Sequence, residues 1–353
     1  MTFSKKLLGT ILCGTLSAAV YAAPPKFVRL HKEAMIPIDM DSAGDKVVGS
    51  AFFGQPIFVW SRGSGLQQLG GGCTAGQVSI SGDGSTIVGC IVDEVTGVQE
   101  AALWLGGTDW RGLGSVEGAV PCGFDLSSSW NTDETGSTAV GLVWLADVCR
   151  AHAGAWDLVN GGPATDLGSL FDNSASRANA ISGSGNVIAG WQDDARGQRL
   201  GAKWGGPGER LITTGTGQHV GEVAELNYDG SAMTGQSFPY GSDDAWVWTK
   251  RGGFQVISTG TDFPIAIPTC MNESGSLVGG TAREFVTGAQ RGWVFADGQL
   301  IWIDEYLASH GLADGWTIFS VTAMSNDGVT LAGFGLNPDL LLEGFVIEGF
   351  RAP

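Results

Sequence analysis

The stretch from Ile80 to Gly89, ISGDGSTIVG, decides the fold because close variants of it recur along the chain. The variant AISGSGNVIAG occupies residues 180–190, and AMSNDGVTLAG occupies residues 323–333. Seven copies share two glycines that are five residues apart. The pairs are Gly44/Gly49, Gly84/Gly89, Gly136/Gly141, Gly185/Gly190, Gly230/Gly235, Gly275/Gly280 and Gly328/Gly333. Such a repeat is typical of solenoids and propellers.

Each copy has the chemistry of a tight turn followed by a buried strand. A type I turn favours Asp, Asn or Ser at its first position and Gly at its fourth, and every copy obeys this rule. The first turn residues are Asp41, Ser81, Asp133, Ser182, Asn227, Asn272 and Ser325. Three residues after the turn glycine the side chain is always apolar, as expected in a strand with one buried face. Every copy is therefore predicted to be a β-hairpin.

Two further strands complete each unit. The third strand ends in an aromatic residue in six copies and in an aliphatic residue in the seventh. These residues are Trp60, Trp104, Trp156, Trp204, Trp248, Phe295 and Ile347. We interpret this position as packing between repeats rather than as a sugar platform. A fourth strand ends at Leu69, Leu113, Leu167, Ile212, Ile257 and Ile303.

The seventh unit has no fourth strand of its own. Residues 27–30, within the segment KFVRL, have the residue pattern of such a strand and no other strand to pair with. We therefore expect them to supply the missing fourth strand and close a ring. The sequence thus predicts an all-β fold, a seven-bladed β-propeller of four-stranded antiparallel blades, over residues 23–353 as one domain. A β-solenoid is the alternative. One short helix is expected near residues 304–311.

The hairpin pattern ISxDGxxIVG, followed by EAxxW and LG, resembles the HAF repeat of exported bacterial proteins and some autotransporter passengers. Residues 315–347 are the closest match, whereas Thr132 and Phe295 depart from the pattern. The resemblance implies an extracellular or cell-surface repeat protein and implies no catalytic residues.

The first 22 residues read as a secretory signal peptide, because Lys5 and Lys6 precede an apolar run and small residues. No later segment is apolar enough for a membrane helix. The chain has 19 Lys and Arg against 36 Asp and Glu, a formal net charge of -17, which would repel nucleic acid and anionic membranes. We therefore expect a secreted, periplasmic or cell-surface protein.

Five cysteines remain after the signal peptide, and an exported protein keeps disulfides. Cys73 and Cys90 lie in corresponding parts of the second unit, as Cys122 and Cys149 do in the third. We predict the pairs 73 with 90 and 122 with 149, each worth roughly 3 kcal/mol in the chain-entropy model. Cys270 is expected to be a buried free thiol.

The sequence contains no serine-hydrolase, zinc-protease or dinucleotide-binding motif. The four histidines stand far apart, and the calcium-like run Asp39, Asp41 and Asp45 lacks a closing Glu. We therefore expect no cofactor and no metal.

A propeller presents its variable loops on one face, where binding residues concentrate. The predicted ligand-binding residues there are Asp193, Asp194, Arg196, Asp243, Asp244, Arg283 and Arg291. We hypothesise a non-catalytic binding or interaction module whose partner is a glycan or a protein. Two alternatives stay open, namely a carbohydrate-active hydrolase or lyase that uses loop carboxylates such as Asp193 and Asp243, and a self-assembling surface component.

Overall fold

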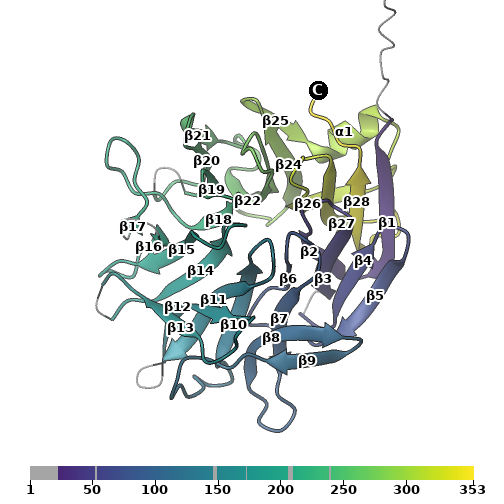
Figure 1. The fold of residues 1–353 in the computed structure, drawn as a ribbon. Helices are drawn as coiled ribbons and strands as arrows, with labels where there is room; N and C mark the ends of the chain where they lie inside the picture. Colours follow the sequence, from purple (N-terminus) through teal and green to yellow (C-terminus); the bar gives the residue numbers. More distant parts are fainter. Residues whose placement is uncertain (1–22, 52–53, 146–148, 172, 206–209, 238–239) are drawn as a thin grey trace, which may run out of the picture.

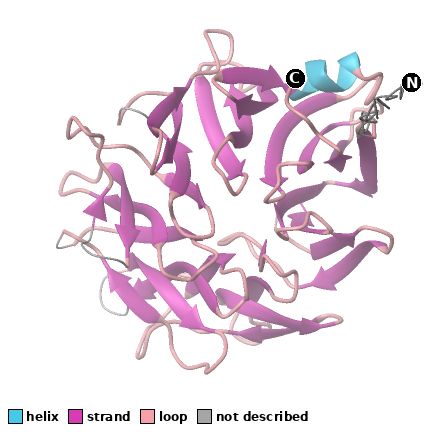
Figure 2. Ribbon diagram, turned by 45° about the horizontal axis from the view of Figure 1, so that its top comes forward, coloured by secondary structure: helices cyan, strands magenta, loops and turns pink. Residues whose placement is uncertain are grey.

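The computed structural model describes residues 23–51, 54–145, 149–171, 173–205, 210–237 and 240–353. In this part of the chain seven four-stranded antiparallel sheets surround one axis (Figure 1 and Figure 2). The predicted seven-bladed propeller is confirmed, and the solenoid alternative is wrong. The predicted signal peptide lies outside the described residues. No helix formed by the described residues is long and apolar enough to cross a membrane.

Each blade is built from consecutive strands. Blade 1 contains β2 (Met35–Met40), β3 (Lys46–Ala51), β4 (Ile57–Ser61) and β5 (Gly65–Gly70). Blade 2 contains β6 (Ser79–Ile80), β7 (Ile87–Val92), β8 (Gln99–Gly106) and β9 (Asp109–Gly112). Blade 3 contains β10 (Ser127–Thr132), β11 (Thr138–Leu145), β12 (Arg150–Asp157) and β13 (Thr165–Gly168). Blade 4 contains β14 (Ser176–Ile181), β15 (Ile188–Asp193), β16 (Arg199–Trp204) and β17 (Arg210–Leu211).

The remaining blades follow the same order until the last. Blade 5 contains β18 (Val223–Leu226), β19 (Ala232–Gln236), β20 (Ala245–Thr249) and β21 (Gly253–Ile257). Blade 6 contains β22 (Ile265–Met271), β23 (Leu277–Arg283), β24 (Gln290–Ala296) and β25 (Gln299–Trp302). Blade 7 contains β26 (Thr317–Met324), β27 (Thr330–Leu336), β28 (Leu342–Glu348) and, as its outer strand, β1 (Lys26–Glu33). The first strands of neighbouring blades contact one another, so they line the axis.

The first glycine of each repeat lies in the predicted turn. In all seven hairpins of the described chain its N–H donates to the carbonyl of the Asp, Asn or Ser three residues earlier. Its φ lies between 65° and 73°, the left-handed region that favours glycine. The first turn residue is buried, and its side chain accepts a hydrogen bond from an amide four or five residues further on. The turn signature therefore satisfies its own buried polar groups.

The seven turns also bind one another around the axis. An N–H group of each turn donates to the carbonyl oxygen of the second residue of the next turn, and the last turn donates back to the first. The accepting carbonyls belong to Gly82, Glu134, Gly183, Tyr228, Glu273, Asn326 and Ser42. Six of these donors are backbone amides, and Asn227 Nδ2 is the seventh. The hairpin end of the propeller is thus a closed ring of hydrogen bonds, which we call the turn ring.

The second glycine of the repeat faces a β-bulge in the first strand. Gly190, for example, pairs with Ala178, and the register then shifts so that Asn179 has no partner on β15. A Cβ at Gly190 would overlap the carbonyl oxygen of Arg177. The same bulge and the same steric conflict occur in six blades; blade 2 differs because β6 has only two residues. The repeat keeps this glycine because the bulged backbone leaves no room for a side chain.

The N-terminal strand closes the ring as predicted. β1 pairs with β28 from Lys26 opposite Glu348 to Glu33 opposite Glu343. Arg29 makes a two-pronged ion pair with the buried Glu343, with Nε to Oε1 at 3.1 Å and Nη2 to Oε2 at 2.6 Å. Phe27 stacks on Phe345 and meets Trp316 edge-on. β1 is therefore held by backbone pairing, charge and aromatic packing together.

The predicted packing positions fill the spaces between blades. Trp156 and Ile347 are buried, as are Trp60, Trp204 and Phe295, while Trp104 and Trp248 pack against core clusters from partly buried positions. The helix α1 spans Ile303–Ser309, close to the predicted range. Ile303, which was predicted to end a fourth strand, is therefore the first residue of the helix. The predicted strand ends Leu113 and Ile212 lie one residue beyond the ends of β9 and β17.

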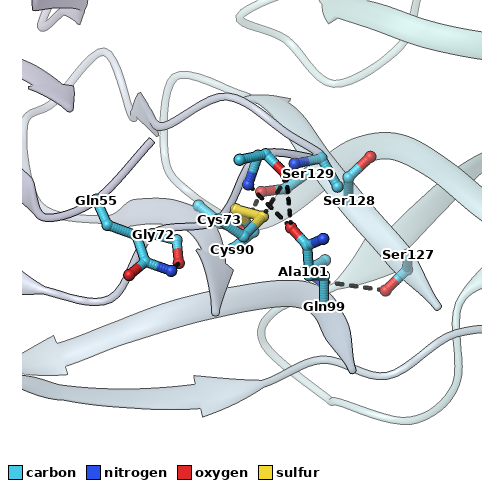
Figure 3. Close-up of a disulfide and its surroundings, with 12 residues drawn as sticks. Gln55, Gly72, Cys73, Cys90, Gln99, Ala101, Ser127, Ser128 and Ser129 are labelled. Carbon is cyan, nitrogen blue, oxygen red and sulfur yellow. Dashed lines mark hydrogen bonds between the residues drawn. A yellow bond between two sulfur atoms is a disulfide. The ribbon is translucent and has the colours of Figure 1, made fainter. Parts of the chain in front are cut away.

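Both predicted disulfides are confirmed. Cys73 bonds to Cys90 and Cys122 bonds to Cys149, with Cα atoms 5.5 Å and 5.1 Å apart, and Cys270 is a buried free thiol in β22. Figure 3 shows the first disulfide beside Gln99 and the segment 127–129 of blade 3. It ties the chain that enters blade 2 to β7, two residues beyond the end of the short β6–β7 pairing. The disulfide therefore anchors the loop where strand pairing is missing.

The ion pair of the closing strand can be tested by substitution. We expect Arg29→Met to lower the free energy of unfolding by about 3 kcal/mol, because it removes the guanidinium that pairs with the buried carboxylate of Glu343. The double variant Arg29→Met/Glu343→Gln should recover at least half of the loss, since it removes both charges. Urea unfolding followed by tryptophan fluorescence measures both. A single variant as stable as the parent protein would contradict the role of this pair.

The bulge glycine gives a second prediction. Gly190→Ala should lower the free energy of unfolding by more than about 2 kcal/mol, because its Cβ meets backbone that cannot move without breaking the bulge. Gly215→Ala is the matched control, since no atom lies within 4 Å of a Cβ there. Thermal unfolding should separate the two variants clearly. Equal melting temperatures would refute this explanation of the second glycine.

Candidate functional site

The bulges decide which side chains enter the central channel. In six blades the residue at the bulge has no partner on the second strand, and each of these residues lines the channel. They are Ile38, Trp130, Asn179, Ala224, Thr269 and Thr322. The residue two positions earlier lies nearer the loop face and lines the channel mouth in four blades, as Ile36, Arg177, Glu222 and Ile267. The repeat therefore specifies the lining positions while their chemistry differs from blade to blade.

The channel mouth on the loop face is a cavity of about 440 Å³ with two different walls. Blades 1 and 6 supply an aliphatic wall of Ile36, Pro37, Ile38, Ile267 and Pro268. The facing wall is polar. It contains Gln77, Trp130, Arg177, Asn179, Glu222 and Gln236.

A stack of charged and aromatic groups holds the polar wall. The Arg177 guanidinium carbon lies 3.6 Å from the ring centre of Trp130, and that of Arg199 lies 3.8 Å from the ring centre of Trp191. Glu222 binds Arg177 Nη2 at 2.6 Å and Arg199 Nη1 at 3.3 Å. Asn179 Nδ2 donates a further hydrogen bond to Glu222 at 2.7 Å. Burial lowers the pKa of Arg177, a cost that Glu222 offsets.

Two more cavities continue from this mouth toward the rim between blades 4 and 5. The middle one, of about 260 Å³, shares Glu222 and Gln236 with the mouth and adds Arg199, Tyr240, Ser242 and Asp243. The outer one, of about 450 Å³, shares Tyr240 and adds Phe171, Leu200, Leu211, His219 and Arg196. We call this row of three cavities the blade 4–5 groove.

Several polar groups in the groove have no partner within the described residues. The Ser242 hydroxyl is buried without a hydrogen bond. The side-chain amides of Gln77 and Gln236 and the carboxylate of Asp243 make no hydrogen bond or ion pair with another described residue. Unpaired polar groups in a concave site favour a ligand that satisfies them.

Some of the binding residues predicted from the sequence line the blade 4–5 groove, and others do not. Asp194, Arg196 and Asp243 line the groove, although Asp194 also caps its own turn and pairs with the exposed Arg196. Asp193 and Asp244 are half-buried beside the groove and do not line it. Burial raises the pKa of Asp193, and Arg199 partly opposes this.

The two predicted arginines of blade 6, Arg283 and Arg291, do not line the groove. Arg291 is bound to Asp304 and Glu305 of α1 and packs over Trp302. Arg283 is exposed at the end of β23. Of the calcium-like run, Asp41 caps its turn and Asp39 points into the channel.

The sequence prediction missed Trp130, Arg177 and Glu222. Arg177 and Glu222 stand thirteen residues before the second glycine of their repeats, a fixed position that marks channel-mouth residues in this chain. Repeat alignment could have singled out that column. It could not have shown that the two side chains bind each other.

The hairpin end of the channel is a smaller cavity of about 130 Å³, and its lining includes the partly buried carboxyl groups of Asp39 and Glu225. Burial raises the pKa of Glu225 to about 8, and the nearby Asp39 adds to the rise. Asp39 also has a raised pKa because of burial, although hydrogen bonds from Ser79 and two amides favour its charged form. Glu225 is therefore neutral at pH 7.

Glu134 lies across the turn ring at this end. Its carboxylate accepts a hydrogen bond from Ser42 of blade 1 at 2.8 Å and occupies the space beside Gly82 of blade 2. Tyr228 likewise lies over Gly183. The glycines at the second turn position of blades 2 and 4 thus make room for side chains from the next blade.

Comparisons with known proteins bear on the fold alone. No family model matches the sequence, and no curated protein matches it. The β-propeller domain of the Trilobed protease from Pyrococcus furiosus, described as an open velcro topology, is similar with a TM-score of 0.58 and 14% identity, over 91% of this chain and 97% of that one. The Cps50 (Swd1) β-propeller domain from Myceliophteria thermophila has a TM-score of 0.55 and 10% identity, over 93% of this chain and 100% of that one. The protein is therefore a β-propeller.

The raised pKa of Glu225 gives a pH-dependent prediction. Between pH 4.5 and 8 the folded state keeps a proton that the unfolded state releases, so this group lowers stability as pH rises. Glu225→Gln should therefore gain stability over the parent protein by about 1.4 kcal/mol for each pH unit in that window. Urea unfolding of both proteins at several pH values measures the difference. A difference that does not change with pH would contradict the raised pKa.

Proposed function

We propose that this β-propeller is an exported, non-catalytic binding module that holds its ligand in the blade 4–5 groove. The observation that carries the proposal is the row of three neighbouring cavities, each of which shares lining residues with the next, from the channel mouth to the rim. Clefts of this size with a few unpaired polar groups are typical ligand sites, and propeller loops are where such sites occur. The groove also contains three of the residues predicted from sequence.

The carboxylates of the groove support binding more than hydrolysis. Glu222 is held by Arg177, Arg199 and Asn179, and Asp194 is engaged by its own turn. Among the carboxylates that line the three described cavities of the groove, Asp243 alone makes no hydrogen bond or ion pair with a described residue. A glycosidase needs two working carboxyl groups that flank the bond, and the proposed partner Asp193 does not line the groove.

Export has independent support from the chemistry of the chain. Each of the two disulfides ties the segment that enters a blade to another part of the same blade, and disulfides persist in oxidising compartments. The resemblance of the hairpins to HAF repeats agrees with a secreted, periplasmic or cell-surface location. The proposed partners are proteins or glycans, and the acidic charge of -17 argues against nucleic acid.

A single substitution can close the groove. Gln236 lines both the mouth and the middle cavity, so Gln236→Trp should fill their junction and weaken any ligand of the groove by at least about tenfold. The control Ser85→Trp adds the same ring at an exposed turn on the hairpin face. The parent protein and both variants, each made as the chain from residue 23 onward, are screened against a glycan array and a displayed peptide library. Ligands that bind both variants equally, or no ligand at all, would overturn the proposal.

A further inference from the structure

We infer that the blade 4–5 groove binds an extended peptide in which a lysine or arginine is flanked by apolar side chains. This inference rests on the proposed binding function and names the chemistry of its ligand. It follows from the order of the three cavities, the charge left unpaired in the middle one, and the unused polar groups along the groove.

The cavities alternate in character along the groove. The outer cavity is lined by Phe171, Leu200 and Leu211, and the mouth has the aliphatic wall that includes Ile36 and Ile267. All three cavities have charged residues in their lining, but the middle cavity alone contains a charged group, Asp243, that has no ion-pair partner among the described residues. An extended chain advances about 3.3 Å per residue and offers a different side chain to each site. A peptide with apolar, basic and apolar side chains matches this order.

The unpaired charge of the middle cavity is negative. Its charged lining groups are Arg199, Glu222 and Asp243. Arg199 and Glu222 form an ion pair at 3.3 Å, and Glu222 is shared with Arg177. Asp243 makes no ion pair with a described residue, so it is the group that a cationic side chain would meet. Asp243 is exposed, so a cation would form a charge-assisted hydrogen bond with it at the edge of the cavity, where salt weakens such a pair.

The unused polar groups suit a peptide backbone. Side-chain amides both donate and accept hydrogen bonds, and Gln77 and Gln236 have neither role filled by a described residue. The buried Ser242 hydroxyl also has no partner. Main-chain N–H and C=O groups of an extended segment alternate, so they can satisfy these groups in turn.

Trp130, which lines the channel mouth, is a poor platform for a sugar. Sugars pack their C–H faces on free aromatic faces, whereas the guanidinium of Arg177 covers a face of Trp130 and that of Arg199 covers a face of Trp191. Arg177 also lies 5.4 Å from the ring centre of Trp191. The two tryptophan rings thus pack against arginine side chains of the polar wall.

The test is selection from a random decapeptide library displayed on phage, with the disulfide-bonded chain from residue 23 onward as bait. The most enriched peptides are synthesised with a fluorescein label, and their binding is measured by anisotropy. We expect them to share a lysine or arginine next to apolar residues. Asp243→Lys should weaken them by about tenfold or more, and added salt should weaken them in the parent protein.

Asp262→Lys is the matched control. Asp262 is exposed in the loop between β21 and β22, lines none of the three cavities, and undergoes the same change of charge. Its variant should keep each affinity within about twofold of the parent value. Enriched peptides that lack a basic residue, or that bind Asp243→Lys as tightly as the parent, would overturn the inference.

The failure of this inference can be told apart from the failure of the proposed function. Binding of oligosaccharides on a glycan array that is lost in Gln236→Trp, with no enriched peptide, would overturn the peptide assignment and leave the binding function in place. Absence of both peptide and glycan binding would overturn both.

Discussion

The turn ring is the constraint on which the rest of the structure depends. Each hairpin turn donates a hydrogen bond to the next, so the seven first strands start from fixed positions around the axis. The first turn residues are buried and bond within their own turns, so the ring adds contacts without leaving buried polar groups unpaired. A ring of this kind is complete only when the last blade reaches the first. The ion pair of Arg29 with Glu343 on β28 serves the same closure at the outer edge.

The bulge links this frame to the candidate site. A second-strand glycine such as Gly190 lets the first strand bulge, and the bulge turns one side chain into the channel. The backbone geometry repeats, but the side chain it presents does not. Trp130, Asn179 and Thr269 occupy one structural position in three blades. A symmetric scaffold thereby acquires an asymmetric channel mouth, with an aliphatic wall facing a charged one.

Much of the fold was predictable because its determinants are local. The turn residues, the apolar strand positions and the pairing of Cys73 with Cys90 depend on neighbours within one repeat unit. Closure by residues 27–30 was also predictable, since one strand lacked a partner and one blade lacked a strand. The bulge was not predicted, because its signal is a glycine that a turn-rich sequence explains in other ways.

The candidate site was only partly predictable. Asp194, Arg196 and Asp243 were placed on the correct face and line the groove. Arg291 was placed on that face too, but α1 follows β25 and supplies Asp304 and Glu305 to neutralise it.

The sequence by itself determined the number of blades, the direction of each strand, the closing strand and the disulfides, because turn chemistry and side-chain alternation act over a few residues. Only the tertiary structure decided that Arg177 and Glu222, forty-five positions apart in the chain, bind each other, with Arg177 on β14 and Glu222 directly before β18. It alone decided that three cavities lie next to one another and share lining residues. The physical reason is that contacts between blades depend on how far each blade turns about the axis, which the packing of the whole ring sets.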